Sequence, residues 1–295
     1  MIGVDVGGLV PAWLIANRKS RALIYWSLEL YFQSDSRDLV WKLLKRLEVA
    51  ASKAAVAIII QDRLRANYLI HENNLREPSV HIVPNSPAGS PVFVRGRYFH
   101  EHLGLESSQR VILYLGAIGP NFCSLELARA AAAWPEDWTL VFHDRARHTE
   151  ADTYIHRVLA AGHGRVVLSS DPVPYRELDG LVSSAEVGIV VYNTELGPNF
   201  STMAGASGKM AQYLRCGLPV VCLDLPGFKE VVDAYGCGRS VSGVEEMGQA
   251  VEWVLTRYPE MRQGAFRCYE NEYEFSKFFA RVVDLIANLD TLPVR

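Results

Sequence analysis

The run Ser207-Gly208-Lys209 places three residue types suited to anion binding at the start of a predicted helix. The hydroxyl of Ser207 can cap the helix, and Gly208 lets an anion approach the free amides of the first turn. Lys209 can add a positive charge there, or its side chain can point to solvent. A helix start with these residues can stabilise the negative charge that develops on a departing diphosphate. An ordinary capped helix that stops at Gly217 explains the same residues equally well.

The elements around this run alternate short apolar segments with amphipathic stretches, which is typical of a parallel α/β sheet covered by helices. Strands are predicted at 22–26, 55–60, 81–83, 111–115, 139–142, 166–168, 187–191 and 219–222. A polar loop follows the strand at 187–191 and leads into the Ser207 helix. We therefore predict an α/β fold with two successive doubly wound units.

The stretch 84–96 has the composition of a linker, with three prolines, two glycines and two serines. We accordingly predict a first domain at 1–90, a second at 91–275, and a carboxyl-terminal helix at 276–295 that can pack back on the first domain. The first domain opens with a turn at Gly7-Gly8 and a helix entered at Pro11. Its few strands predict an incomplete domain. Three explanations stay open: an upstream start, a trimmed chain, or a partner chain that completes the sheet.

The stretch 39–51 predicts an amphipathic helix. The apolar residues at helical spacing are Val40, Leu43, Leu44, Leu47 and Ala51, and the charged residues that fall mostly on other faces are Lys42, Lys45, Arg46 and Glu48. Two interpretations of the mildly basic side stay open. It is either an ordinary solvated face or a contact with an anionic membrane surface.

Composition limits the classes of protein to which the chain can belong. It has 295 residues, 49% of them hydrophobic and 21% charged, which indicates a folded globular protein of about two domains. The net charge of -3 gives no basic field for a nucleic-acid partner. The five cysteines form no CxxC pair, so buried reduced thiols are expected. Without an apolar run of membrane-spanning length or a signal peptide, we predict a cytoplasmic protein, with peripheral contact to the inner membrane surface left open.

The segment 207–221, SGKMAQYLRCGLPVV, closely resembles a signature of retaining GT-B glycosyltransferases of the family 4, or group 1, type. Nearly the whole chain takes part in this resemblance. Further segments similar to that group are 26–31, 82–86, 111–119, 174–178 and 224–232. The resemblance implies two facing Rossmann-like domains, the first of them incomplete here. It also implies sugar transfer from a nucleotide diphosphate sugar, with retention of configuration, in the cleft between the domains.

Several site residues follow from the resemblance alone. It implies that Gly116 and Gly119 form the turn against the donor phosphates and that Tyr175 lies beside the nucleobase. No cofactor is expected, because the nucleotide sugar is a substrate and such enzymes usually bind no metal. Protein cations must then neutralise the diphosphate. The acceptor would be a saccharide or a lipid-linked molecule in polysaccharide or glycoconjugate biosynthesis.

The sequence departs from the family pattern in the donor site. The arginine and lysine that commonly follow the glycine turn are missing from 116–123, and the two family glutamates are replaced by Ala204 and Gln212. Gln212 can still hydrogen-bond a ribose hydroxyl. Lys209 and Arg145 are candidate replacement cations, although Arg145 can equally be a solvated loop residue.

Two carboxylates complete the candidate residues. Glu195, in the loop after the strand at 187–191, is expected to face the cleft, or else to be merely solvated. Glu29, at the end of the strand at 22–26, can orient or deprotonate an acceptor hydroxyl, or it can be a charge favoured at a helix start.

Three hypotheses for the function remain. The first is a glycosyltransferase in which Ser207, Gly208 and Lys209 stabilise the departing diphosphate and Glu29 serves the acceptor. The second is a non-catalytic GT-B relative that acts as a binding or regulatory subunit, which the missing cations and glutamates favour. The third is a GT-B sugar-nucleotide epimerase, for which the sequence supplies no evident acidic and histidine groups.

Overall fold

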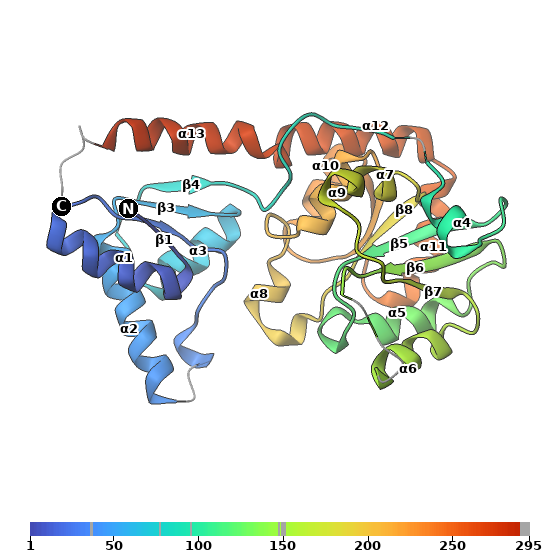
Figure 1. The fold of residues 1–295 in the computed structure, drawn as a ribbon, viewed down its shortest axis with the longest axis horizontal. Coiled ribbons are helices and arrows are strands. Elements are labelled where there is room, and N and C mark those ends of the chain that lie inside the picture. The colour runs from blue at the N-terminus through green and yellow to red at the C-terminus, as the bar shows by residue number, and fades with distance from the viewer. Residues whose placement is uncertain (36–37, 77, 95, 147, 149–151, 290–295) are drawn as a thin grey trace. The chain divides into compact units, whose positions relative to one another are not determined.

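The structure, a computed structural model, describes residues 1–35, 38–76, 78–94, 96–146, 148 and 152–289 (Figure 1). The chain divides into two compact units. Unit 1 consists of Met1–Ala88 with Phe275–Arg295, and unit 2 consists of Gly89–Glu274. The chain therefore passes out of unit 1 and returns to it at its carboxyl end.

Unit 1 contains a four-stranded parallel sheet in the order β1-β2-β3-β4. Its strands are β1 (Ile2–Val4), β2 (Ile24–Trp26), β3 (Ala57–Ile60) and β4 (Val80–Ile82), and its helices are α1 (Asp5–Lys19), α2 (Leu39–Ala54), α3 (Arg63–Glu72) and α13 (Phe275–Ala287). Residues of α1, α2 and α3 pack with Tyr25 and Ile58 on one face of the sheet. Val282 of α13 packs with Ile24 and Ile59 on the other face. Helices therefore cover both faces of this parallel sheet.

Capping side chains set the beginnings of two of these helices. Asp38 accepts a hydrogen bond from the Trp41 amide at the start of α2, and Asp62 accepts one from the Arg65 amide at the start of α3. Both are N-cap aspartates in extended backbone, the arrangement that satisfies an orphan amide of the first turn.

The amino-terminal prediction was wrong in its detail. The residues expected to form a turn, Gly7 and Gly8, lie inside α1, and Pro11 is an interior residue of that helix rather than its entry. The helix follows β1 immediately, a strand that the sequence did not predict. Gly3 permits this tight connection, because a Cβ atom there would lie 2.5 Å from the Leu9 Cα.

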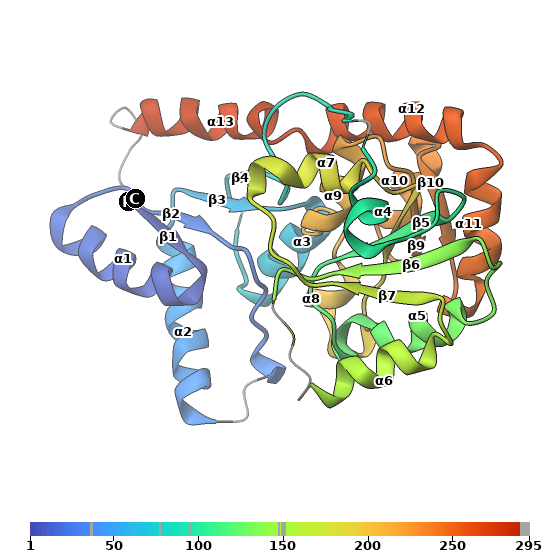
Figure 2. The ribbon, with the colours of Figure 1, turned by 45° about the vertical axis from the view of Figure 1, so that its right-hand side comes forward.

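Unit 2 contains a six-stranded parallel sheet in the order β10-β9-β8-β5-β6-β7 (Figure 2). Its strands are β5 (Arg110–Leu115), β6 (Trp138–His143), β7 (Val166–Ser169), β8 (Val187–Val190), β9 (Val220–Leu223) and β10 (Gly238–Val241). Its helices are α4 (Tyr98–Leu103), α5 (Ser124–Ala131), α6 (Thr153–Ala161), α7 (Leu178–Val182), α8 (Pro198–Ser201), α9 (Gly208–Arg215), α10 (Phe228–Tyr235), α11 (Met247–Leu255) and α12 (Tyr258–Cys268), and α12 continues into a π-helix at Tyr269–Tyr273. Two buried apolar clusters, one on each face, form the core.

The strand order of unit 2 reverses between β5 and β8. From β5 the chain winds outward to β6 and β7, and from β8 it winds the other way to β9 and β10. In an open α/β sheet, the carboxyl edge at such a reversal is where ligands bind. The elements after β5 and β8 are therefore the first place to look for a site.

Close packing fixes α9 at this reversal. Gly188 of β8 leaves room for the Tyr213 ring, since a Cβ atom there would lie 2.4 Å from a ring carbon. The Tyr213 hydroxyl accepts a hydrogen bond from the Leu115 amide at 2.6 Å and donates to the Leu113 carbonyl at 3.1 Å. These contacts tie α9 to both β8 and β5.

Each of the eight predicted strands corresponds to an observed one, and β1 and β10 are additional. The prediction of an α/β fold with two parallel, doubly wound units is confirmed. No helix among the described residues is both long and apolar enough to cross a membrane.

Candidate functional site

The amino terminus of α9 is built by a buried serine. The Ser207 hydroxyl accepts a hydrogen bond from the Met210 amide at 3.4 Å and shares another, of 2.8 Å, with the Tyr192 hydroxyl. The loop before it is fixed by Tyr273 in the π-helix, whose hydroxyl donates to the Ala204 carbonyl at 2.9 Å. Gly208 is the first helical residue. The capped helix start expected from the sequence is therefore present.

Lys209 is the most unusual residue of the site. Its ammonium nitrogen is buried and has no hydrogen-bond partner among the described residues. It lies 3.9 Å from the centre of the Tyr114 ring and 4.9 Å from that of Tyr192, with Phe122 at 5.6 Å. Burial lowers the pKa of Lys209 to about 7. The ring faces favour a cation at this distance but do not replace an anionic partner.

No negative charge from the neighbouring tyrosines compensates this ammonium. Burial raises the pKa of Tyr192 to about 12, and it raises the pKa of Tyr114 well above its ordinary value. Both hydroxyls therefore stay neutral at pH 7. A buried cation that lacks a carboxylate is costly, and an external anion at the helix start would supply the missing partner.

The glycine turn after β5 lies directly against Lys209. Gly116 has φ of +123°, and a Cβ atom built on it would lie 3.6 Å from Lys209 Cε and 3.7 Å from Nζ. The rest of the turn is held by the Gly119 amide, which donates to the Ser124 hydroxyl at 3.1 Å. The turn itself carries no cation, as the sequence showed. Lys209 brings one to it from α9.

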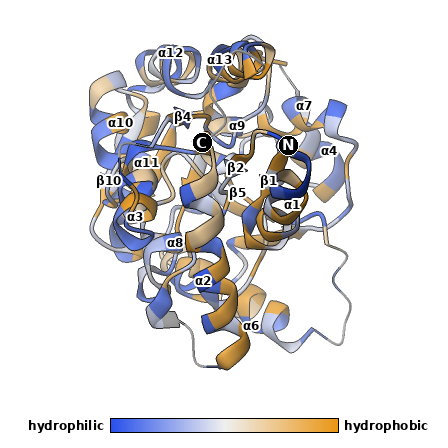
Figure 3. Cartoon of the chain, turned by 90° about the vertical axis from the view of Figure 1, so that its left-hand side faces the viewer, coloured by the Kyte–Doolittle hydropathy of each residue, from blue (hydrophilic) through white to orange (hydrophobic). Residues whose placement is uncertain are grey.

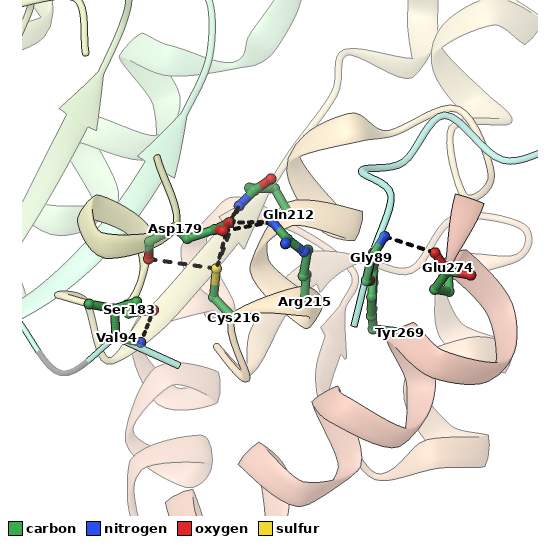
Figure 4. A network of polar contacts seen from close by, with 9 residues as sticks. All are labelled: Gly89, Val94, Asp179, Ser183, Gln212, Arg215, Cys216, Tyr269 and Glu274. Atoms are coloured by element: carbon green, nitrogen blue, oxygen red, sulfur yellow. Dashed lines mark hydrogen bonds and ion pairs between the residues drawn. The ribbon is translucent and has the colours of Figure 1, made fainter. Parts of the chain in front are cut away.

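Gln212, one turn further along α9, faces α7. Its amide nitrogen donates to Asp179 Oδ1 at 2.7 Å and to Cys216 Sγ at 3.5 Å (Figure 4). Arg215 Nη1 donates to both oxygens of Asp179, at 2.6 and 2.7 Å. Asp179 could not be identified from the sequence, because no local pattern distinguishes it from any other helix carboxylate.

The other predicted donor residues lie in loops of unit 2. Tyr175, 70% exposed, begins the 3-10 turn Tyr175–Glu177 before α7, and Glu195 is an exposed residue of the 3-10 turn Thr194–Leu196 after β8. Arg145 is exposed after β6 and forms no ion pair within the described part of the chain. None of the three makes a described contact with Lys209. The structure therefore brings together Gly116, Ser207, Gly208, Lys209 and Gln212, with Gly119 in the adjoining turn.

Glu29 lies in unit 1, in the loop after β2. Its carboxylate is 59% exposed and lies 3.7 Å from Nη2 of the buried Arg65. Asp5 Oδ1 accepts hydrogen bonds from the amides of Leu28 and Glu29, which fixes this loop at the carboxyl edge of the sheet. Burial raises the pKa of Glu29, and the positive charge of Arg65 lowers it by a smaller amount. Because Glu29 precedes the 3-10 turn Gln33–Asp35 and starts no helix, the alternative role as a helix-start charge does not apply.

The predicted amphipathic helix is present as α2, but of the residues expected on its apolar face only Ala51 is fully buried. The residues that α2 buries are Lys45, Glu48, Ala51 and Ser52. Lys45 Nζ donates to Glu48 Oε2 at 2.7 Å and to Asn73 Oδ1 at 2.7 Å, and the Tyr25 hydroxyl donates to Glu48 Oε1 at 2.8 Å. Partners on β2 and after α3 thus stabilise a buried charged pair at positions that the periodicity assigned to the polar faces of the helix.

The apolar residues at the start of α2 are exposed instead. The exposed fractions are 83% for Leu39, 67% for Val40, 48% for Trp41 and 56% for Leu43. Figure 3 shows the first turns of α2 in the hydrophobic colour. Lys42 and Arg46 are exposed on the same stretch, whereas its only acidic residue, Glu48, is buried.

No family model and no curated protein matches the sequence. Solved structures do match the fold. HepE of Anabaena, solved in complex with UDP and glucose, is 13% identical with a TM-score of 0.74, over 97% of this chain and 78% of HepE. Sucrose-phosphate synthase from Thermosynechococcus elongatus is 16% identical with a TM-score of 0.74, over 98% of this chain and 73% of that enzyme.

A third similar structure is WaaG, a glycosyltransferase involved in lipopolysaccharide biosynthesis. It is 14% identical with a TM-score of 0.63, over 96% of this chain and 83% of WaaG. These proteins are GT-B glycosyltransferases, and the two Rossmann-like units of this chain have the same fold. The predicted GT-B fold is confirmed.

Proposed function

We propose that this chain is a glycosyltransferase that moves a sugar from a nucleoside diphosphate sugar to a saccharide or lipid-linked acceptor, with retention of configuration. The observation that carries the proposal is the buried ammonium of Lys209. It has no hydrogen-bond partner in the described part of the chain, and it lies at the amino terminus of α9 beside a glycine turn. The complexes of HepE with UDP, with UDP-glucose and with UDP and glucose support a nucleotide ligand for this fold.

In this proposal the donor diphosphate lies against the first turn of α9. The free amides of the helix and the Lys209 ammonium neutralise the charge that grows on the leaving diphosphate as the bond to the sugar breaks. The sugar then has oxocarbenium character. Groups that interact only with the charge on the departing diphosphate stabilise the transition state more than the bound substrate, and they therefore lower the reaction barrier. These protein groups supply the positive charge that the proposal requires, so it needs no metal ion.

Glu29 is assigned to the acceptor in unit 1. Its pKa is raised by burial, and a carboxylate with a raised pKa is a better proton acceptor at neutral pH. Its loop is anchored through Asp5 and Arg65, so that the carboxylate itself can turn towards a bound hydroxyl. Glu29 accordingly orients or deprotonates the acceptor.

We assign the exposed start of α2 to contact with an anionic membrane surface. Leu39, Val40, Trp41 and Leu43 form an apolar surface next to Lys42 and Arg46, the composition of an interfacial helix. The test is flotation with vesicles of phosphatidylcholine alone and with added phosphatidylglycerol. Leu39→Asp with Leu43→Asp should abolish binding to the anionic vesicles. Leu14→Asp, at a 53% exposed position on α1, is the matched control, and equal loss in both variants would contradict the assignment.

The donor proposal is tested by calorimetric titration with UDP, GDP and their sugar conjugates, with and without Mg²⁺. Binding in the micromolar range that does not depend on the metal is the expected result. Lys209→Met should remove it, whereas Lys229→Met, which deletes an exposed lysine paired with Asp233 at 2.6 Å, should not. Absence of binding by every nucleotide at millimolar concentration would overturn the proposal in favour of a binding or regulatory role.

A further inference from the structure

Two buried polar side chains hold the backbone of the loop that follows β2. Gln61 Nε2 donates to the carbonyls of Ser27 and Leu28, at 3.0 and 2.9 Å. Arg65 Nη2 donates to the same Leu28 carbonyl at 2.7 Å. The side chains of Gln61 and Arg65 are only 2% and 1% exposed. Backbone carbonyls need donors rather than a charge, and the neutral amide of Gln61 already holds both of these.

Arg65 therefore brings a buried positive charge that the backbone contacts do not require. Its Nε donates to Gln61 Oε1 at 2.9 Å, so the guanidinium is fixed in place. Taking an ion out of water is costly unless a carboxylate lies close to it. Burial lowers the pKa of Arg65, and the charge of Glu29 opposes this more than the charges of Asp62 and Asp5 do. Glu29 is thus the main counter-ion of Arg65.

Glu29 itself is presented to solvent by the same loop. Its Oε2 lies 3.7 Å from Arg65 Nη2, which is longer than an ordinary hydrogen bond. Its amide donates to Asp5 Oδ1 at 3.0 Å. Burial raises the pKa of Glu29, Arg65 lowers it, and the charge of Asp5 raises it again. Tyr31 is the third group that acts on this carboxylate: burial raises the pKa of Tyr31, and the charges of Asp5 and Glu29 add to the rise.

The backbone of Asp5 indicates that this loop is built for a purpose. Asp5 has φ of +49°, a conformation that a residue with a side chain adopts at a cost. In return its carboxylate accepts hydrogen bonds from two successive amides, those of Leu28 and Glu29. The loop is thus held through its amides on one side and through its carbonyls on the other.

We propose that Arg65 is a positioning residue that keeps Glu29 ionised on a fixed loop, ready to accept the proton of an acceptor hydroxyl. The inference rests on the proposed function, because it requires Glu29 to act on the acceptor. In that step the hydroxyl oxygen bonds to the sugar, the diphosphate leaves with the electrons of its own bond, and the hydroxyl proton passes to Glu29. An attraction at 3.7 Å favours the charged carboxylate without a short contact that an acceptor must displace.

The experiment follows the carboxyl carbon of Glu29 by NMR through a pH titration of the full chain, with Glu29→Gln to assign the signal. Arg65→Gln retains an amide that can donate to the Leu28 carbonyl but removes the charge, so the Glu29 midpoint should shift to higher pH. Arg65→Lys retains the charge and should shift the midpoint less. Arg63→Met removes an exposed arginine from the same helix and is the matched control, with no shift expected. An unchanged midpoint in Arg65→Gln would overturn the inference.

A measurement on the wild-type chain decides the matter even if Arg65→Gln does not fold. The Nε–H group of Arg65 should show a step in its NMR signals at the pH where Glu29 titrates, because the two charges interact directly. That step should vanish in Glu29→Gln, and the exposed Arg63 should show none. An Arg65 signal that ignores the titration of Glu29 would overturn the coupling.

Turnover distinguishes positioning from a merely structural role. With an acceptor found by screening, wild-type turnover should fall as the pH drops through the Glu29 midpoint. In Arg65→Gln this fall should move to higher pH with the midpoint, so that turnover below both midpoints is lower by about tenfold while donor affinity is unchanged. A fall that stays in place would overturn the positioning role. The NMR titrations need no nucleotide, so their failure is distinct from a failure to bind any nucleotide, which would overturn the proposed function and this inference together.

Discussion

Replacing Lys209 by methionine should stabilise the chain while abolishing nucleotide binding. The substitution removes the ammonium and leaves an unbranched apolar side chain among the rings of Tyr114, Phe122 and Tyr192. Because the ammonium has no hydrogen-bond partner among the residues that the structure describes, its burial opposes folding. A residue whose removal improves stability and destroys binding is a residue kept for its ligand.

The magnitude follows from the pKa. Burial lowers the pKa of Lys209 from 10.5 to about 7 in the folded chain. At 1.36 kcal/mol for each pKa unit, the charged form is disfavoured by about 5 kcal/mol. Below pH 7 the lysine is charged in both the folded and the unfolded chain, so this whole cost is present. Between pH 7 and 10.5 only the unfolded chain binds the proton, so stability rises with pH and the cost disappears.

The assay is thermal and urea unfolding of both chains at pH 6 and pH 9. Attraction to the aromatic rings offsets part of the cost, so Lys209→Met should gain about 2–5 kcal/mol at pH 6, or roughly 4 °C or more in Tm. The gain should be smaller at pH 9. Lys229→Met, which breaks an exposed ion pair, should change stability far less. A variant less stable than the wild type at pH 6, or one that still binds UDP, would refute the reasoning.

Three further predictions follow from the same contacts. Nucleotide binding must return the proton to Lys209, so the affinity for UDP should fall about fivefold between pH 7 and pH 8. Calorimetry in buffers of different ionisation enthalpy would detect the proton uptake. An affinity for UDP that does not change with pH would argue against contact between the diphosphate and Lys209. Glu29→Gln should lower turnover by about 100-fold or more with the acceptor found by screening, with unchanged donor affinity; a loss of donor affinity instead would remove Glu29 from the acceptor role. Glu48→Leu should destabilise the chain by about 3–5 kcal/mol in urea unfolding, because it leaves Lys45 buried and unpaired, whereas Glu48→Leu with Lys45→Met should recover most of that loss.

The strands of both sheets could be predicted because buried parallel strands are continuous apolar runs. The two missed strands, β1 and β10, lie at sheet edges and carry weaker patterns. Gly238-Arg239-Ser240-Val241 contains two polar residues and a glycine, and Ile2-Gly3-Val4 is only three residues long. Only Gly3 of β1 is buried, and Arg239 and Ser240 of β10 are exposed or half-buried, so neither strand is a continuous apolar run.

The face that α2 buries could not be predicted from periodicity. The pattern places Lys45 and Glu48 on polar positions, and it contains no information on Tyr25 and Asn73, which lie far away in the sequence and satisfy that pair. Asp179 escaped prediction for the same reason, since it meets Gln212 only through the packing of α7 against α9. Local sequence reveals a capped helix start, but the partners of buried charges depend on the tertiary fold.

The geometry around Lys209 changes the interpretation of the arginine and lysine that are missing from the donor site. A turn at 116–123 without arginine or lysine indicates, on its own, a site that has lost its ligand. A chain that no longer bound an anion would nevertheless gain stability from an apolar residue at position 209, because the ammonium there is buried among rings and has no hydrogen-bond partner within the described ranges. Lys209 and Gly116 instead occupy adjoining positions, because a Cβ atom built on Gly116 would lie only 3.7 Å from the ammonium nitrogen. The positive charge is therefore present at the turn but comes from α9, which is the arrangement expected if the anion site has been rebuilt rather than abandoned.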